Sequence, residues 1–237
     1  MSPDVEKLAA LAEFAAGAGH EINNPLATIV GRVQQLLRDE TDPVRRAALH
    51  SIGAQAYRVR DMIGDVMLVA RPPQPAPGVI SFAPLADEVV ERFRGEPESA
   101  KTSIATDYSA GAEVWADPTQ LATILHELLR NSRQASGEAN GKIRLAARRL
   151  ELGEQLFCEI TVSDQGRGFS EHERIHAFDP FFSGRQAGRG LGFGLCKCWR
   201  IAEMHQAIIE IASQPAGPTT VRLIWPAKSP QSPSTGR

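Results

Sequence analysis

The sequence predicts an all-α helical hairpin followed by an α+β two-layer sandwich. Apolar residues recur at helical intervals as far as residue 70, four prolines interrupt residues 71–78, and short strand-like runs separated by turn residues follow. Helices grouped between strand hairpins favour a two-layer sandwich over a parallel βαβ array. The expected domains are the helical hairpin at 1–71, a proline-rich linker at 72–78, the α+β body at 79–226 and a disordered tail at 227–237.

Composition and charge are those of an ordinary soluble protein. Hydrophobic residues make up 42% and charged residues 23% of the 237 positions. The formal net charge of -2 suggests no groove for nucleic acid. No apolar run reaches the roughly 18 residues of a membrane helix, and the N-terminus lacks the basic region and apolar core of a signal peptide. The three cysteines form no disulfide framework, so we expect a cytoplasmic protein without a membrane segment.

Two long helices are predicted for the hairpin. Ser2-Pro3 can cap and start the first, which runs to about Arg38, and Asp42-Pro43 can do the same for the second after a short turn. Apolar residues of the second helix alternate in steps of three and four, which indicates a seam with a period of about 3.5 residues. Two copies in a dimeric four-helix bundle would bury this seam, and packing on the downstream domain is the alternative. The seam comprises Leu49, Ile52, Ala56, Val59, Ile63, Val66 and Ala70.

The body beyond the linker mixes predicted helices and strands. Its strongest helix begins at Asp117-Pro118, and residues 166–194 are rich in glycine and expected to form a loop. The inner face of that helix is expected to be Leu121, Ile124, Leu125, Leu128 and Leu129. Helices are predicted at 84–94, 118–135 and 195–205, and strands at 102–108, 113–115, 142–149, 156–163, 207–212 and 219–225.

The segment GHEINNPL places a histidine beside a carboxylate inside the first helix. Because a helix stacks residues three and four apart, His20 and Glu21 each share a face with Asn24. A histidine next to a base on an exposed helix is a candidate nucleophile. Taken alone, such a pair is more often a solvated surface histidine, so the interpretation depends on the rest of the chain.

Two segments of the body fit the binding of a nucleotide. In HELLRN, Glu127 and Asn131 lie one helical turn apart, and a carboxylate and an amide on one face suit Mg²⁺ carrying phosphates. A plain polar outer face would look the same. In DQGRG, Asp164 can accept a hydrogen bond from an exocyclic amine, while Gly166 and Gly168 let the backbone pass close to a flat base. Alone, this pattern is often only a turn.

Two further segments add aromatic and glycine-rich loops. FDPFF, at residues 178–182, is dense enough in aromatics to anchor a loop on a core or to form an exposed gate. GRGLGFG, at residues 188–194, leads into a helix, where free backbone N–H groups can cradle phosphate. It is neither a Walker loop, since no Gly-Lys-Ser/Thr follows, nor a dinucleotide fingerprint, since no strand opens it.

Together the segments resemble the conserved boxes of the two-component sensor histidine kinases. GHEINNPL is similar to their H box, close to the nitrogen-regulation type, and HELLRN, DQGRG, FDPFF and GRGLGFG resemble the N, G1, F and G2 boxes in the family's order. The resemblance covers about residues 5–226. It implies a dimerisation and histidine phosphotransfer domain followed by a Bergerat-type ATP-binding domain, with ATP and Mg²⁺ as cofactors. It also implies a homodimer and, as phosphate acceptor, an aspartate in the receiver domain of a response regulator.

The resemblance implies a role for each matching residue. His20 would accept the γ-phosphoryl group, Glu21 would orient the ring and act as its base, and Asn24 would position water during dephosphorylation of the partner. In the body, Asn131 would ligate Mg²⁺ and Asp164 would bind the adenine amino group, in a pocket shaped by Gly166 and Gly168. A lid over the phosphates would be formed by Gly188, Gly190 and Gly192. This lid would be anchored by Phe181 and Phe182. As lid cations, Arg185 and Arg189 can offset phosphate charge.

Some residues depart from the family's pattern. Glu127 stands where these kinases often have Asn, and the wider ATPase superfamily uses Glu there as a base, so Glu127 is also a candidate base or metal ligand. This leaves two rivals to the kinase: a Bergerat-fold ATPase or serine kinase using Glu127, and a non-catalytic scaffold. His205-Gln206-Ala207 replaces the usual His-Gly-Gly. Because no sensing domain precedes the hairpin, either the chain is a fragment or its signal comes from an upstream sensor protein.

Overall fold

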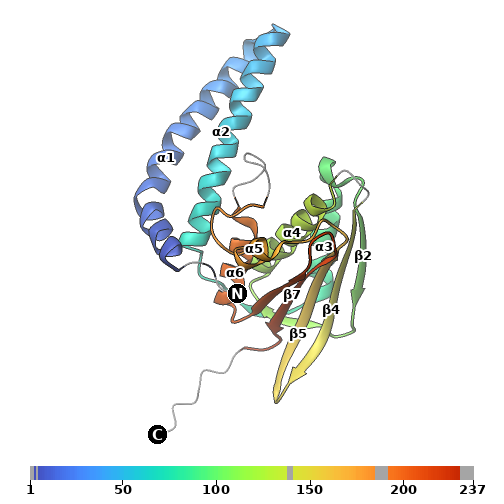
Figure 1. The fold of residues 1–237 in the computed structure, drawn as a ribbon. Helices are drawn as coiled ribbons and strands as arrows, with labels where there is room; N and C mark the ends of the chain where they lie inside the picture. Colours follow the sequence, from blue (N-terminus) through green and yellow to red (C-terminus); the bar gives the residue numbers. More distant parts are fainter. Residues whose placement is uncertain (1–2, 4, 138–140, 185–191, 230–237) are drawn as a thin grey trace. The chain divides into compact units, whose positions relative to one another are not determined.

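A computed structural model describes residues 3, 5–137, 141–184 and 192–229 (Figure 1). The chain divides between Pro73 and Gln74 into two compact units, which are described separately. Within the described residues, no helix is both long enough and apolar enough to cross a membrane. The domain limits given above, which place the linker at 72–78, are kept as a proposal.

The first unit is the predicted helical hairpin, formed by α1 (Val5–Asp39) and α2 (Pro43–Ala70). Asp42 caps α2, because its carboxylate accepts hydrogen bonds from the backbone N–H groups of Val44 (2.8 Å) and Arg45 (3.1 Å). Leu26 and Val33 of α1 are buried, and Gly53 of α2 lies so close that a Cβ there would be 3.3 Å from Val33 Cγ1. Small residues on α2 therefore allow the two helices to approach closely.

An apolar stripe of the hairpin remains exposed within this unit. Of the predicted seam, Ala56, Val66 and Ala70 are buried. Ile52 is 51% exposed and Val59 38% exposed. On α1, Ile29 and Leu36 are likewise exposed. The two helices of a single hairpin therefore bury some of these apolar side chains against each other and leave the others exposed.

The second unit contains a five-stranded mixed sheet and a two-stranded sheet. The spatial order of the larger sheet is β2-β4-β5-β7-β6, in which β2 pairs with β4 in parallel and the other neighbours are antiparallel. Its strands are β2 (Ser103–Tyr108), β4 (Lys142–Leu152), β5 (Gln155–Asp164), β7 (Thr219–Pro226) and β6 (Ile208–Ser213). In the smaller sheet, β1 (Gly78–Ser81) pairs antiparallel with β3 (Glu113–Ala116).

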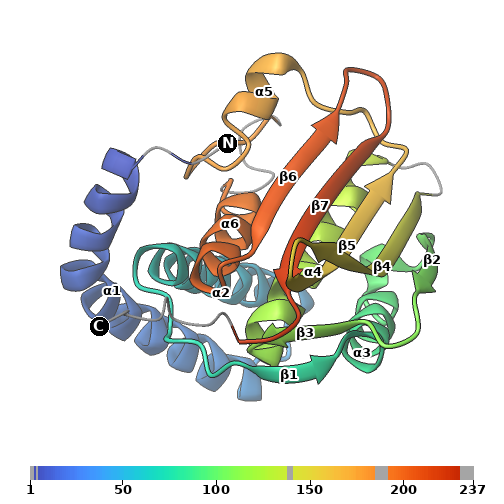
Figure 2. The ribbon, with the colours of Figure 1, turned by 90° about the horizontal axis from the view of Figure 1, so that it is seen from below.

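Helices cover one face of the larger sheet and form the second layer (Figure 2). The helices are α3 (Phe82–Arg94), α4 (Pro118–Ala135), the short α5 (Glu171–Ile175) and α6 (Gly194–Met204), with a 3₁₀ turn at Pro97–Ser99. α4 contacts β4 and β5, α6 contacts β6, and α3 packs beside α4. The α+β two-layer prediction is confirmed. The five leucine and isoleucine residues predicted for the inner face of α4 are each at most 1% exposed.

The sequence missed several features of this unit. The first strand, β1, occupies residues assigned to the end of the linker and the start of the body, and α5 lies in the stretch expected to be loop. The helix predicted from Pro84 begins at Phe82, because proline is tolerated in the first turn of a helix. The parallel pairing of β2 with β4 was not predicted either. It becomes possible because β3 and α4 form the crossover between the two strands.

His205 joins the C-terminus of α6 to the N-terminus of α4. Its ring Nε2 accepts the backbone N–H of Asp117 (3.1 Å), so Nδ1 carries the proton and donates to the carbonyl oxygen of Ile201 (2.9 Å). Burial lowers the pKa of this imidazole, which favours the neutral form that both bonds require. His205 thereby fixes the C-terminus of α6 to the N-terminus of α4, while the candidate site lies nearer the opposite ends of both helices.

Gln206, next to this histidine, adopts the left-handed backbone conformation (φ 54°) that glycine takes at a helix C-terminus. Its side chain is exposed, so truncation removes little packing. We expect Gln206→Gly to raise the free energy of unfolding by about 0.5–1 kcal/mol, since relief of left-handed strain outweighs the added chain entropy. Denaturant unfolding would measure the gain. Ala212→Gly in β6, where no such strain exists, should instead lower stability, and a loss at Gln206 would contradict the argument.

Candidate functional site

The polar face of α4 carries the first group of candidate residues. Asp117 caps the helix by accepting hydrogen bonds from the N–H groups of Thr119 (2.9 Å) and Gln120 (3.1 Å), and the apolar face lies against the sheet. Glu127 and Asn131 lie one turn apart on the opposite side, as their spacing predicts. The buried Nδ2 of Asn131 has no hydrogen-bond partner in the part of the chain that the structure describes. Such an orphaned donor suits a site that a polar ligand completes.

Asp164, the last residue of β5, lies beside the C-terminal part of α4. It is 4% exposed. Its Oδ1 accepts the N–H of Gly166 at 2.8 Å, and the Ser132 hydroxyl also donates to the carboxylate. Burial raises the pKa of this carboxyl, and the two hydrogen bonds oppose that rise. A buried carboxylate that still has a lone pair available after these two hydrogen bonds is suited to a ligand with an N–H donor.

Two glycines after Asp164 allow close approaches of the backbone. A Cβ at Gly166 would lie 2.6 Å from the Cβ of Ala135, so the turn packs directly on the last turn of α4. Gly168 has a φ of 68°, and a side chain there would collide with the carbonyl oxygen of Gln214. Both glycines therefore hold the turn against its neighbours, which fixes Asp164 beside α4. The prediction that they line a base pocket is not tested by this geometry.

The start of α6 reaches the same polar face of α4. A Cβ at Gly194 would lie 3.0 Å from Glu127 Oε2 and 3.5 Å from Asn131 Nδ2. Gly192 has a φ of 75° and sits against the carbonyl oxygen of Phe182. The Phe181 and Phe193 rings pack edge to face, with centroids 4.7 Å apart. The segment resembling the G2 box thus contacts the N-box segment through Gly194 and the F-box segment through Gly192 and Phe193.

Phe182 is held by two histidines of the α5 region. Its ring centroid lies 5.7 Å from that of His172 and 5.6 Å from that of His176. His176 Nδ1 is in turn 2.8 Å from a carboxylate oxygen of Asp179. Of the two phenylalanines predicted to anchor the loop, Phe182 is thus packed against two imidazole rings, whereas Phe181 is 58% exposed with a φ of 63°.

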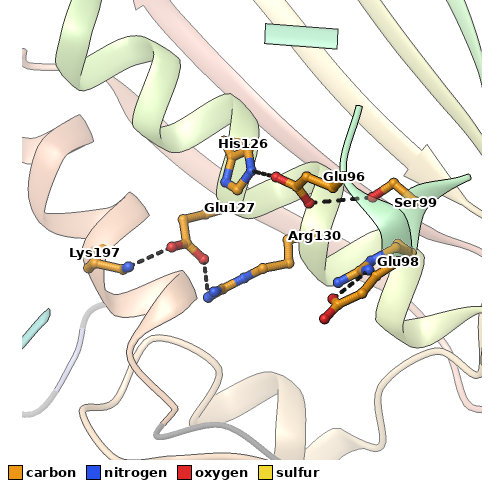
Figure 3. Close-up of polar contacts among 8 residues, drawn as sticks. Glu96, Glu98, Ser99, His126, Glu127, Arg130 and Lys197 are labelled. Carbon is orange, nitrogen blue, oxygen red and sulfur yellow. Dashed lines mark hydrogen bonds and ion pairs between the residues drawn. The ribbon is translucent and has the colours of Figure 1, made fainter. Parts of the chain in front are cut away.

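A charged cluster surrounds Glu127 (Figure 3). Its carboxylate oxygens contact Lys197 Nζ of α6 and Arg130 Nη2, each at 2.5 Å. Glu127 and Lys197 are each 5% exposed. Sequence reasoning named Glu127 but missed Lys197, which no motif marks. The available signal was a basic residue flanked by two cysteines in the apolar first half of the helix.

A second ion pair, also missed, ties the turn after Asp164 to α5. Arg167 donates to both carboxylate oxygens of Glu173, at 2.7 and 3.1 Å. Ser170 and Glu173 form a reciprocal capping box at the start of α5. These partners lower the pKa of Glu173 to about 2. The Ser-x-x-Glu spacing was readable in the sequence and would have predicted the helix.

The remaining predicted residues lie elsewhere. Glu21 and Asn24 are exposed on α1 in the first unit. His20 belongs to the same helix, but its side chain lies outside the described residues. Gly188, Arg189, Gly190 and Arg185 also lie outside them. The structure therefore places Glu127, Asn131, Asp164 and Gly166 on or against α4, and Phe182 against Gly192 just before α6. The roles predicted for these residues stay a proposal.

Two family models match the chain. The model described as "His Kinase A (phospho-acceptor) domain" matches residues 10–75. The model described as "Histidine kinase-, DNA gyrase B-, and HSP90-like ATPase" matches residues 116–229. Both halves and their order agree with the resemblance drawn from the boxes. The chain belongs to the sensor histidine kinases.

Curated sensor histidine kinases match nearly the whole chain. It is 30% identical over 222 residues to the signal transduction histidine-protein kinase AtoS of Escherichia coli (strain K12), covering 93% of this chain and 36% of that protein. It is 31% identical over 212 residues to the sensory histidine kinase/phosphatase NtrB of Klebsiella oxytoca, covering 86% of this chain and 59% of that protein. The chain thus spans only part of the length of either relative.

Solved histidine kinases share the fold. The crystal structure of full-length ShkA in complex with AMPPNP matches with a TM-score of 0.78 and 19% identity, covering 92% of this chain and 47% of that chain. At this level of identity, the match supports the order and arrangement of the elements alone.

Proposed function

We propose that this chain is an ATP-dependent protein histidine kinase that phosphorylates His20 and passes the phosphoryl group to an aspartate of a response regulator. One observation carries the proposal: along α4, the orphaned amide of Asn131 lies beside the start of α6, and the neighbouring Ser132 donates a hydrogen bond to the buried carboxylate of Asp164. The same chain also contains a phosphoacceptor-type hairpin. The match of residues 116–229 to the model of histidine kinase-, DNA gyrase B- and HSP90-like ATPases supports ATP as the ligand.

The residues of the site fit ATP with Mg²⁺. Asp164 offers the acceptor that an adenine amino group needs. Asn131 offers an amide oxygen to a cation and a free amide N–H to phosphate oxygen. The N–H groups at the start of α6 add partial positive charge near the phosphates. Mg²⁺, when bound, supplies neutralisation of the charge on the phosphates.

Phosphoryl transfer would then depend mainly on position. A neutral imidazole, with an ordinary pKa near 6.5, has a lone pair with which His20 attacks the γ-phosphorus. The bond from phosphorus to the ADP oxygen breaks as the new bond from phosphorus to nitrogen forms. Glu21 accepts the proton of the ring, and Asn24 positions water when the regulator is dephosphorylated.

The hairpin supports a homodimer. The exposed apolar stripe of Ile29, Leu36, Ile52 and Val59 is of the kind that a second copy would cover in a four-helix bundle. Sedimentation should therefore give twice the chain mass of 25.7 kDa. Other inferred partners are the receiver domain of a response regulator and an upstream sensor protein or segment, and the expected location is the cytoplasm.

Labelling with ATP tests the function. We expect the wild-type chain, given γ-labelled ATP and Mg²⁺, to acquire label that is stable in alkali and lost in acid, as a phosphorus–nitrogen bond requires. Addition of a receiver domain should move the label to that protein. Release of ADP without labelled protein would contradict the kinase proposal and favour an ATPase.

A further inference from the structure

The pair formed by Glu127 and Lys197 is the least expected feature of the nucleotide site. Both side chains are buried, and the two residues are 70 positions apart in the sequence, on different helices. Arg130, which is 37% exposed, contacts the second carboxylate oxygen. Each oxygen of Glu127 therefore has its own cation, as Figure 3 shows.

The pair lies at the end of the site where phosphates are expected. Glu127 Oε2 is 3.0 Å from the Cβ position of Gly194, and the amide atoms of Asn131 lie 3.5 and 3.6 Å from that same position. An uncompensated carboxylate here would repel phosphate oxygens, and in a buried site this repulsion is weakly screened. The two cations around this one carboxylate remove that repulsion.

We propose that Lys197 is a positioning residue of the nucleotide site. It neutralises the carboxylate of Glu127 and keeps that carboxylate in a structural role beside the phosphates, so that Glu127 does not act as a base. The proposal rests on the proposed function, because it assumes that ATP phosphates bind beside Asn131. Lys197 acts only through Glu127, whose two oxygens already accept from cations and so are not presented to water. This geometry disfavours the rival in which Glu127 activates water or a hydroxyl.

A double-mutant cycle tests the coupling. Lys197→Met should weaken the affinity for Mg²⁺-AMPPNP, measured by calorimetry, by about tenfold, because the Glu127 charge loses its main partner. The apparent KM for ATP should rise similarly, while the labelling rate at saturation changes little. Adding Glu127→Gln should restore affinity to within about threefold of wild type, since no buried charge then remains unpaired. Lys142→Met, at an exposed lysine of β4, is the matched control and should change neither quantity.

Two outcomes would overturn the proposal. One is a double variant whose affinity loss equals the sum of the single losses, which would show that Lys197 does not act through Glu127. The other is a double variant that binds nucleotide normally but labels about a hundredfold more slowly, which would make Glu127 a base. If Lys197→Met alone fails to fold, the double variant carries the test, because it keeps both side-chain volumes and buries no charge at this pair.

The affinity measurements separate this inference from the proposed function. They require nucleotide binding but no phosphoryl transfer. If the wild type binds AMPPNP and never acquires label, the kinase proposal fails while the cycle still decides the role of Lys197. If labelling succeeds and the cycle shows no coupling, only the role of Lys197 is wrong.

Discussion

His20→Gln is expected to reduce labelling by γ-labelled ATP to background while leaving nucleotide affinity unchanged. Glutamine keeps polarity and helix propensity, so α1 should persist, but its amide has no nucleophilic lone pair. The affinity should survive because Asn131 and Asp164 belong to the other compact unit. Calorimetry with AMPPNP and gel-based counting of bound label measure the two effects separately.

The matched control for this change is His50→Gln, at an exposed histidine of α2. It should label like the wild type. Persistent label on the His20 variant would assign the phosphoacceptor to another residue. Loss of both label and affinity would instead mean that the substitution had damaged the fold, which circular dichroism would reveal.

Local patterns were sufficient to predict the longer helices. Asp117-Pro118 marked the start of α4, and the spacing of its leucines identified the buried face, because both signals reside in a few neighbouring residues. β1 is only four residues long and pairs with β3 more than thirty residues away. Its existence depends on that distant partner, so no local period could indicate it.

The sequence identified most residues of the candidate site but not the contacts between them. Helical periodicity placed Glu127 and Asn131 on one face, and the turn after β5 marked Asp164. The contact of Lys197 with Glu127 was not predictable, because the two residues lie on different helices and a single lysine carries no periodic signal. Only tertiary packing brings this buried lysine to the buried carboxylate.

Asp164→Asn is expected to lower affinity for AMPPNP by about ten- to a hundredfold. The carboxylate accepts from Gly166 N–H and the Ser132 hydroxyl, and still has a lone pair for an adenine amino group. Asparagine offers one acceptor oxygen and turns an N–H₂ group toward the remaining donors. Losing a hydrogen bond to a charged group costs about 1.5–3 kcal/mol. Asp107→Asn, at an exposed aspartate of β2, is the control and should bind normally.

The same substitution is expected to stabilise the nucleotide-free protein at neutral pH. Because burial raises the pKa of Asp164 above its unfolded value, the folded state binds the proton more tightly than the unfolded chain. This contribution is present at low pH and is lost as the pH rises through the folded pKa, so the ionised carboxylate opposes folding at pH 7. The variant should therefore melt higher than wild type at pH 7–8, and the difference should shrink as the pH falls toward 4.

Melting curves across that pH range, without nucleotide, measure this second effect. A variant that melts lower than wild type at pH 7 would show that the hydrogen bonds to the carboxylate outweigh its burial. Lower affinity together with higher stability would identify Asp164 as a residue whose charge is retained for binding at the expense of the fold. That combination is expected of a site residue and not of a turn residue, for which the loss of hydrogen bonds would reduce stability and leave AMPPNP binding unaffected.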